Sequence, residues 1–267
     1  MVEASGGLAL QEVVLDRRLP QELAARGLSI SRADIERERT LLTEAIIQSA
    51  QASPADAERL LESVRRSRGL GEERFEALLR RNAAMRKLVA ADVQVSEEEL
   101  AQAFDMRHGP RYRMRVILVP SQSGAAQLRE QLSRSQADTS VRFAEAAMRE
   151  STDPSASRGG MLEPISVSDP AYPIALRQAA KTLEVGQISA VLGVERGYVI
   201  ALMEERIPAD GVTLQSTSAA ITAEVRTKRE RLAMDDLARR LLQESQVKVM
   251  DRQLQASYRA ASGATQP

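Results

Sequence analysis

The chain has 267 residues, and its 37 basic and 37 acidic side chains leave a formal net charge of zero. This length allows roughly one to two domains, and 43% hydrophobic with 28% charged residues is a globular composition. Zero net charge removes any global electrostatic argument for binding nucleic acid. There is no cysteine and only one histidine, His108. Cysteine nucleophiles, disulfides and Cys/His zinc sites are therefore excluded within one chain.

No apolar run approaches the roughly 20 residues that a membrane-spanning helix needs. The first residues, 1–7, also lack the basic region and apolar stretch of a signal peptide. We expect either a cytosolic protein or an exported protein whose leader has been removed.

Residues 8–107 predict consecutive helices, because their apolar side chains recur at helical spacing. Three local signals mark helix starts, two of them with the spacing of a capping box and one with proline at the first helical position. These signals are Ser31 with Asp34, Ser53 with Pro54, and Ser96 with Glu99. Arginines and glutamates also alternate along residues 58–81, which favours a solvated, salt-bridged face.

The pattern changes at Gly109, from which a compact mixed domain is expected. Residues 111–119 alternate and are rich in β-formers, so they predict a strand. The expected elements that follow are helices at 125–132 and 143–148, a loop at 151–164, a helix at 173–182, and strands at 187–192 and 197–205 with a turn at 195–197.

A linker at 208–211 precedes a long amphipathic helix over 214–245 and a short strand at 247–250. Such a helix must bury its apolar stripe, so we expect it to pack back on the N-terminal helices. The predicted fold class is α+β, a mostly helical module with an inserted mixed domain. The predicted domains are 1–108, 109–207, a C-terminal helical segment at 212–252, and a disordered tail at 253–267.

Five motifs in order across residues 111–206 resemble the parvulin family of peptidyl-prolyl isomerases. Parvulins have a first strand R-H-I-L-V, a Phe-Ala helix, a loop D-x-S-x-x-x-G-G-x-L, a helix ending L-x-x-G-x-x-S, and a last strand G-Y-H-I-I. The corresponding segments here are Arg115–Val119, Phe143–Ala147, Asp153–Leu162, Leu183–Ser189 and Gly197–Ala201.

The flanking helices are similar to those of the SurA/PrsA type of bacterial envelope foldase, in which a helical chaperone module carries an inserted parvulin domain. The segment Ser96–Leu100, just before the parvulin strand, is typical of that type. This resemblance implies unfolded or extended polypeptide clients as partners and a periplasmic or cell-envelope location. It implies membrane association only through an anchor upstream of Met1.

The resemblance also implies a catalytic site. Parvulins place two hydrogen-bonded histidines beneath a Cys or Asp, and a nearby threonine joins this network. The histidine positions fall on Val116 and Val199, the threonine position on Val194, and the Cys/Asp position on Asp153. Only Asp153 retains a polar side chain.

The proline-binding pocket of the family falls on aliphatic residues here. The implied substrate-binding residues are Leu162, Ile165, Ile174 or Leu176, and Ser189, with Tyr172 or Pro170 at a position that is Met in the family. No metal or other cofactor is implied, since prolyl isomerisation breaks no covalent bond.

Three valines at network positions indicate a parvulin domain that has kept its fold and lost its polar site. Replacing a whole polar set by apolar residues can be nearly neutral for stability, whereas removing one partner is costly. We therefore predict a foldase or chaperone that binds polypeptide with weak or no isomerase turnover. An active isomerase that uses Asp153 and an apolar pocket is the alternative, and a non-catalytic interaction scaffold is the second. In all three, Asp153 can also serve as a turn cap.

Overall fold

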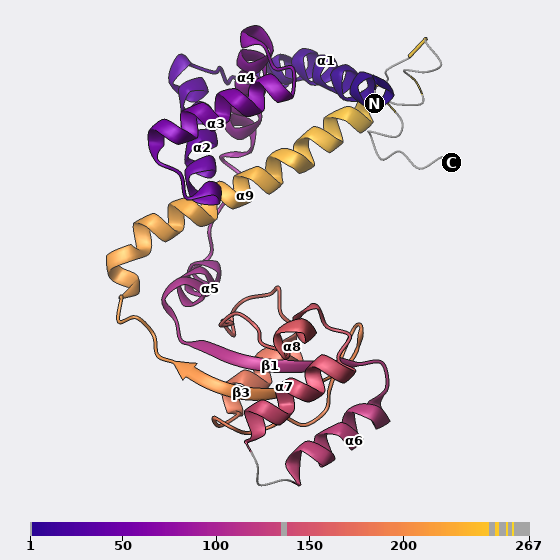
Figure 1. The fold of residues 1–267 in the computed structure, drawn as a ribbon. Coiled ribbons are helices and arrows are strands. Elements are labelled where there is room, and N and C mark those ends of the chain that lie inside the picture. Colours follow the sequence, from indigo (N-terminus) through magenta and orange to yellow (C-terminus); the bar gives the residue numbers. More distant parts are fainter. Residues whose placement is uncertain (1, 135–137, 246–248, 251–254, 256–257, 259–267) are drawn as a thin grey trace. The chain divides into compact units, whose positions relative to one another are not determined.

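A computed structural model describes residues 2–134, 138–245, 249–250, 255 and 258. The chain divides into two compact units. Unit 1 comprises residues 1–94 and 226–267, and unit 2 comprises residues 95–225 (Figure 1). The predicted fold class, a helical module that carries an inserted mixed domain, is confirmed. The boundary lies at Gln94, so the helix before the first strand belongs to unit 2, whereas the sequence assigned residues up to 108 to the helical module.

Unit 1 is helical, and its helix starts follow the local signals in the sequence. Ser31 forms both hydrogen bonds of a capping box with Asp34, and the Ser53 hydroxyl accepts a hydrogen bond from the Asp56 amide. The helices are α1 (Val2–Ala25), α2 (Arg32–Ala50), α3 (Pro54–Ser67), α4 (Glu72–Val89) and the part of α9 (Leu214–Glu244) from Arg226 onward.

The main core of unit 1 joins helices from both ends of the sequence. Leu19 of α1, Leu88 of α4, and Met234 and Leu241 of α9 are fully buried in one cluster. At about 25 cal/mol per Å², burying each large aliphatic side chain contributes about 1.5–3 kcal/mol. The expected return of the C-terminal helix onto the N-terminal helices is therefore confirmed. A second cluster, around Phe75, joins α2, α3 and α4.

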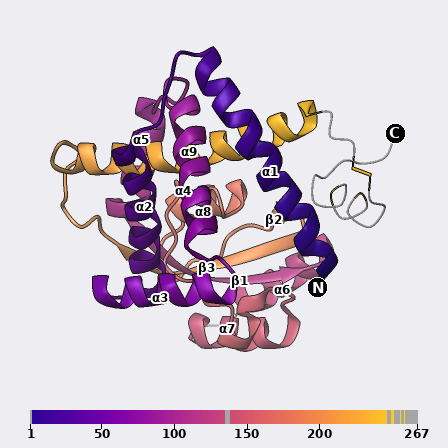
Figure 2. The ribbon, with the colours of Figure 1, turned by 90° about the horizontal axis from the view of Figure 1, so that it is seen from above.

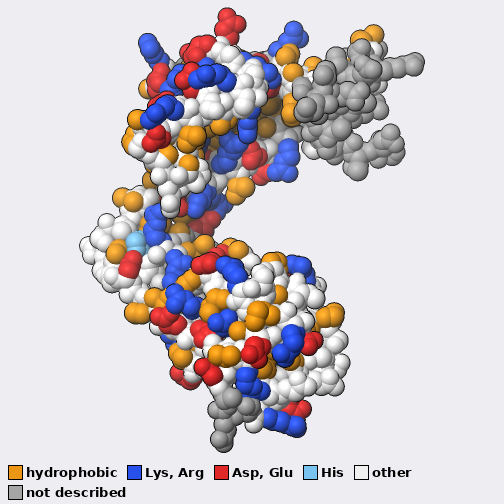
Figure 3. Space-filling view, in the orientation of Figure 1, with side chains coloured by type: hydrophobic (Ala, Val, Ile, Leu, Met, Phe, Trp, Pro, Cys, Tyr) orange, Lys and Arg blue, Asp and Glu red, His pale blue; other side chains and the backbone are white. Residues whose placement is uncertain are grey.

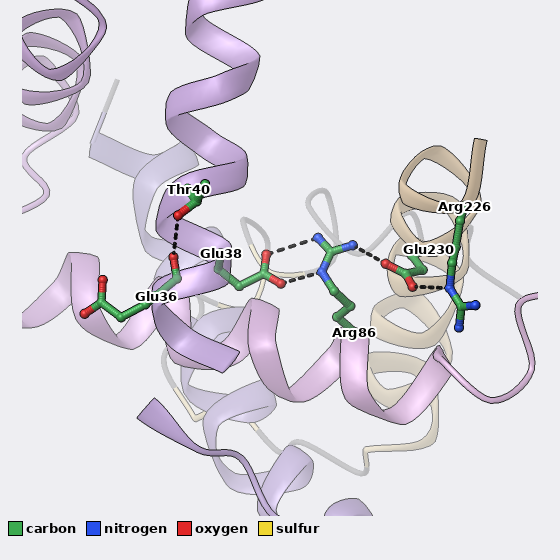
Figure 4. Close-up of polar contacts among 6 residues, drawn as sticks. All are labelled: Glu36, Glu38, Thr40, Arg86, Arg226 and Glu230. Carbon is green, nitrogen blue, oxygen red and sulfur yellow. Dashed lines mark hydrogen bonds and ion pairs between the residues drawn. The ribbon is translucent and has the colours of Figure 1, made fainter. Parts of the chain in front are cut away.

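A buried ionic network also connects α2, α4 and α9. Arg86 of α4 donates two hydrogen bonds to Glu38 of α2, one of them 3.1 Å long, and a third to Glu230 of α9 at 2.7 Å. Arg226 donates to the other carboxylate oxygen of Glu230 at 3.1 Å (Figure 4). Burial opposes the charge of Arg86, but the hydrogen bonds to Glu38 and Glu230 outweigh it and raise the arginine pKa.

Unit 2 contains a three-stranded antiparallel sheet in the order β1-β3-β2, with four complete helices, the first part of α9 (residues 214–225) and a short 3₁₀ helix among its described residues. Strand β1 matches the predicted range 111–119. The elements before α9 are α5 (Glu97–His108), β1 (Arg111–Val119), α6 (Gln122–Ser133), α7 (Thr139–Glu150), η1 (Pro154–Arg158), α8 (Ile174–Thr182), β2 (Leu192–Val194) and β3 (Gly197–Ile207).

The sheet has two differently covered faces, because side chains alternate along each strand. Ile117, Ile200 and Leu202 point to the face that α6 and α7 cover. Val116 and Val199 point to the opposite face, which packs against α8 (Figure 2). This second face carries the candidate site.

Two predicted elements of unit 2 need correction. The strand expected at 187–192 is displaced: Ile188 makes only an isolated bridge with Leu202, and regular pairing begins at Leu192. The loop expected at 151–164 contains the helix η1, since Asp153 caps a short helical turn.

Half of the strand expected at 247–250, and all of the disordered tail expected at 253–267 except Gln255 and Tyr258, lie outside the described residues. Among the described helices, none has the length and apolarity required to cross a membrane.

Candidate functional site

Unit 2 contains a cavity of about 1170 Å³ on the α8 face of its sheet. Its volume exceeds the roughly 300–1,000 Å³ of a small-molecule pocket, so it can hold a polypeptide segment of several residues. The lining comes from β1, the loop after η1, the segment 170–173, α8, and the β2–β3 hairpin. The residues are Val116, Leu118, Asp153, Leu162, Pro170–Arg177 and Gly193–Val199.

The floor of the cavity is aliphatic. The register of the sheet places Val116 opposite Ala201 and Leu118 opposite Val199, so Val116 and Val199 are diagonal neighbours on one face. Both valines are buried, and Val194 packs beside them from β2. The three positions to which the resemblance assigned a polar network thus line one cavity and are entirely apolar.

The structure brings most of the predicted site residues together. Asp153, Val116, Val199, Val194, Leu162, Tyr172, Ile174 and Leu176 all line the cavity. Ile165 and Ser189 do not line it. Ile165 is buried beneath the sheet face, where its backbone pairs with Tyr112.

Ser189 has a structural role instead of a place in the cavity. Its hydroxyl donates to the Ala190 carbonyl at 2.6 Å and accepts from the Ala201 amide at 2.9 Å. The serine thereby closes the irregular segment before β2 onto β3, which also explains why regular pairing starts later than the sequence suggested.

Asp153 lines the cavity, but its carboxylate is engaged locally. One oxygen, Oδ1, accepts hydrogen bonds from the Ser155 amide at 2.9 Å and the Ser155 hydroxyl at 2.6 Å. This is the N-cap of η1, so the turn-cap reading of Asp153 is confirmed. The second carboxylate oxygen, Oδ2, is left to meet a bound polypeptide.

The wall opposite the hairpin consists of the segment 170–173 and α8. Burial raises the pKa of the Tyr172 hydroxyl, with smaller contributions from the negative charges of Asp169 and Glu163. Tyr172 therefore stays neutral at physiological pH and can donate a hydrogen bond. Arg177 holds this wall from α8, where it donates to the carbonyls of Tyr172 and Val167 at 3.1 Å each.

Several lining residues escaped the sequence analysis. Leu118 lies two residues beyond Val116 on the same strand face, so strand periodicity was a signal that could have found it. Glu195 and Arg196 form the two-residue turn between β2 and β3 and place one charge of each sign at the rim. No local signal in the sequence directs this turn toward the cavity.

The cavity lining combines apolar side chains with a few polar and charged ones. Within the described residues, no group of three or more His, Cys, Asp or Glu side chains is placed to hold a metal ion. The single histidine lies elsewhere in unit 2, at the end of α5, where its Nδ1 is 2.7 Å from Asp210 Oδ2. Charges of both signs are interspersed over the face of the molecule that Figure 3 shows. The site can bury an apolar group and offer a few polar contacts at its rim.

Fold and site define a class of protein, a helical module that carries a parvulin-like domain. Residues 95–218 match the family described as the PPIC-type PPIASE domain, so this part of the chain is a parvulin-type peptidyl-prolyl isomerase domain by family. No curated protein matches the sequence.

Three PrsA proteins are among the solved structures to which the chain is similar. The peptidylprolyl isomerase PrsA from Bacillus anthracis is 19% identical with a TM-score of 0.51, over 91% of this chain and 98% of that chain. PrsA from Bacillus cereus is 21% identical with a TM-score of 0.48, over 97% and 90%. The foldase PrsA from Streptococcus pneumoniae is 18% identical with a TM-score of 0.46, over 97% and 92%. The chain shares the fold of the Bacillus anthracis protein along most of its length.

Proposed function

We propose that this protein is a folding factor that binds unfolded or proline-containing polypeptide in the cavity of unit 2, with weak or no isomerase turnover. One observation carries the proposal: a large cavity lies over the positions to which the resemblance assigns the parvulin network, and its floor is made of Val116, Leu118 and Val199. A cavity of this kind favours apolar side chains and proline rings, because burying apolar surface stabilises the complex.

Turnover requires more than binding. The barrier to rotation about the peptide bond is about 18–20 kcal/mol, and an enzyme lowers it only by binding the twisted amide better than the planar one. Preorganised hydrogen-bond donors aimed at the reacting group are the usual means. The valines at 116, 194 and 199 supply none, which supports weak turnover.

The binding half of the proposal is tested with substitutions of two exposed apolar residues. Ile174 is 65% exposed and lines the cavity, whereas Val185 is 59% exposed and does not. We expect Ile174→Glu to raise the dissociation constant for an Ala-Pro-containing peptide about 3- to 10-fold, since it removes about 1 kcal/mol of apolar contact. Val185→Glu should leave it unchanged. Equal effects of the two substitutions would contradict binding in this cavity.

The catalytic half is tested by exchange NMR of the same peptide at equal concentrations of this protein and a functional parvulin. We expect no detectable acceleration of cis/trans exchange by this protein, because its floor holds no polar network. An exchange rate like that of the parvulin would favour the second candidate, an active isomerase. The position of Asp153 in the cavity lining is the observation in favour of that candidate.

We also propose that the protein acts on unfolded chains in the bacterial cell envelope, which rests on the resemblance to envelope foldases and the shared PrsA fold. The test is the suppression of aggregation of a chemically unfolded protein by the full chain, with Ile174→Glu as the comparison. A scaffold without client binding would suppress nothing. A leader sequence upstream of Met1 in the genome would support the location, and localisation of the protein to the cytosol would refute it.

A further inference from the structure

One wall of the cavity is an irregular segment, residues 166–173, that supplies Pro170, Ala171, Tyr172 and Pro173 to the lining. The segment has no regular hydrogen-bond ladder of its own. Two of its amides bond to side chains: Ser166 Oγ accepts from the Ser168 amide at 3.2 Å, and Asp169 Oδ1 accepts from the Ala171 amide at 2.9 Å. The Asp169 and Tyr172 amides form single turn bonds to the carbonyls of Ser166 and Asp169. Such a segment is well ordered only if neighbouring elements fix it.

Helix α5 fixes the outer side of this segment. Asp105 Oδ2 accepts a short hydrogen bond from the Ser168 hydroxyl and a longer one, 3.5 Å, from the Ser166 hydroxyl. One turn earlier on α5, Gln102 Nε2 donates to the Ser168 carbonyl at 2.9 Å. Neither Asp105 nor Gln102 lines the cavity. Their contacts are with the segment that does.

The close packing around Asp105 is visible at Gly109. A Cβ atom placed on Gly109 would lie 2.2 Å from Asp105 Oδ1, so only glycine allows the carboxylate to take this position. The short hydrogen bond to Asp105 comes from Ser168, which is half-buried, and Ser166 beside it is 1% exposed. A carboxylate that accepts a short hydroxyl hydrogen bond is a strong anchor, because bonds to charged groups contribute more than neutral ones.

We propose that Asp105 and Gln102 of α5 are positioning residues for polypeptide binding in the cavity, acting through Ser168 on the wall that contains Tyr172. This inference rests on the proposed binding function. Arg177 holds the same wall from α8, so the segment is clamped on two sides. A preordered wall lowers the entropy lost when a polypeptide binds, which increases affinity without any direct contact.

The inference is tested with Asp105→Ala, Asp105→Asn and, as a matched control on the same helix, the exposed acid Glu98→Ala. With the Ala-Pro-containing peptide, we expect Asp105→Ala to raise the dissociation constant about 3- to 10-fold, from the added cost of ordering the wall. Asp105→Asn should restore most of the affinity, since its amide oxygen still accepts from a serine hydroxyl. Glu98→Ala should bind as the unsubstituted protein does. An unchanged dissociation constant in Asp105→Ala would overturn the inference.

Hydrogen exchange of backbone amides separates this inference from the proposed function. Asp105→Ala should speed exchange at the Ser168, Ala171 and Tyr172 amides and leave that of Leu202, in the central strand, unchanged. If the unsubstituted protein binds no peptide, the proposed function fails, and faster exchange confined to these amides still supports the positioning of the wall. Unchanged exchange refutes it. Faster exchange with unchanged peptide affinity would show a purely structural role and would also refute it.

Discussion

The two units treat polar groups in their interiors in opposite ways. In unit 1, Arg86, Glu38 and Glu230 are buried and joined in one network across three helices. In unit 2, the floor of the cavity is also made of buried residues from separate elements, but these are aliphatic: Val116 of β1 and Val199 of β3.

Both arrangements follow from one physical rule. A buried polar group is tolerated when all its partners are present and is costly when one is missing. Unit 1 keeps the whole set of charges, whereas unit 2 has none of the network that its family resemblance implies. The difference indicates that a unit with a partly complete polar network would be less stable than one with the complete network or one with no network at all. Substitutions can test this in both units.

The largest effect is expected from Arg86→Met in unit 1. This substitution leaves Glu38 buried without a cation, while Glu230 keeps its hydrogen bond from Arg226. We expect unfolding of unit 1 to require about 3–5 kcal/mol less free energy, the usual cost of breaking a buried ion pair from one side. Denaturant unfolding followed by circular dichroism measures the change.

Two further variants bracket this prediction. Arg80→Met, on the same helix, removes an exposed pair with Glu76 and should cost about 0.5 kcal/mol or less. Replacing Arg86, Glu38 and Glu230 together by apolar residues should recover most of the lost stability, because no buried charge is then left unpaired. Arg226 loses Glu230 in this variant, but its side chain is half exposed and keeps its hydrogen bond to the Ala90 carbonyl. If the triple variant is less stable than Arg86→Met, the free energy of unfolding does not depend on whether the charges of the network are all present or all absent.

These buried charges also mark the limit of what the sequence predicts. The capping boxes at Ser31 and Ser96 and the strand 111–119 follow from local patterns, and the structure confirms them. Arg81, in contrast, belongs to a pattern that favoured a solvated face, yet it is buried and paired with Asp16, 65 residues earlier. Partners so far apart along the chain leave no local signal.

The same limit applies to the candidate site. Positions on regular strands, such as Val116 and Val199, could be placed from motif order and period-two alternation. Ser189 was misassigned because its hydroxyl bonds with the backbone of β3 across a segment without regular pairing. The wall at 170–173 depends on contacts from α5, which lies before the first strand and which the motifs did not include.

A moderate effect is expected from Val116→Thr, which puts one polar group on the apolar floor of unit 2. Threonine has nearly the same shape, so the change isolates the burial of a hydroxyl with no partner among the neighbouring valines. We expect unit 2 to lose about 1–2 kcal/mol of unfolding free energy. The exposed Val185→Thr is the control and should change stability by about 0.5 kcal/mol or less. If Val116→Thr is as stable as the unsubstituted protein, the floor of the cavity accepts a single polar group without cost. The absence of polar groups from the floor would then not follow from the cost of an incomplete network.

The smallest effect is expected at Asp34, one turn before Glu38 on α2. Asp34 forms a partly exposed ion pair with Lys87 of α4. Hydrogen bonds from the Lys87 ammonium and then from the Ser31 amide and hydroxyl lower the pKa of Asp34 from 3.8 to about 2. A carboxylate with a depressed folded-state pKa adds stability that is present above its unfolded-state pKa and is lost as pH falls through the folded value.

We therefore expect Asp34→Asn to cost about 1 kcal/mol near pH 7, the sum of a weakened helix cap and an exposed ion pair. This cost should shrink between about pH 4 and pH 2, where the unsubstituted Asp34 becomes protonated. Urea unfolding of both proteins across this pH range measures it. Lys87→Met removes the largest cause of the shift, so the pH at which the Asp34 contribution disappears should rise toward the ordinary value. A difference that stays constant with pH would show that neither the pair with Lys87 nor the helix cap at Ser31 depends on the charge of Asp34, against the lowered pKa.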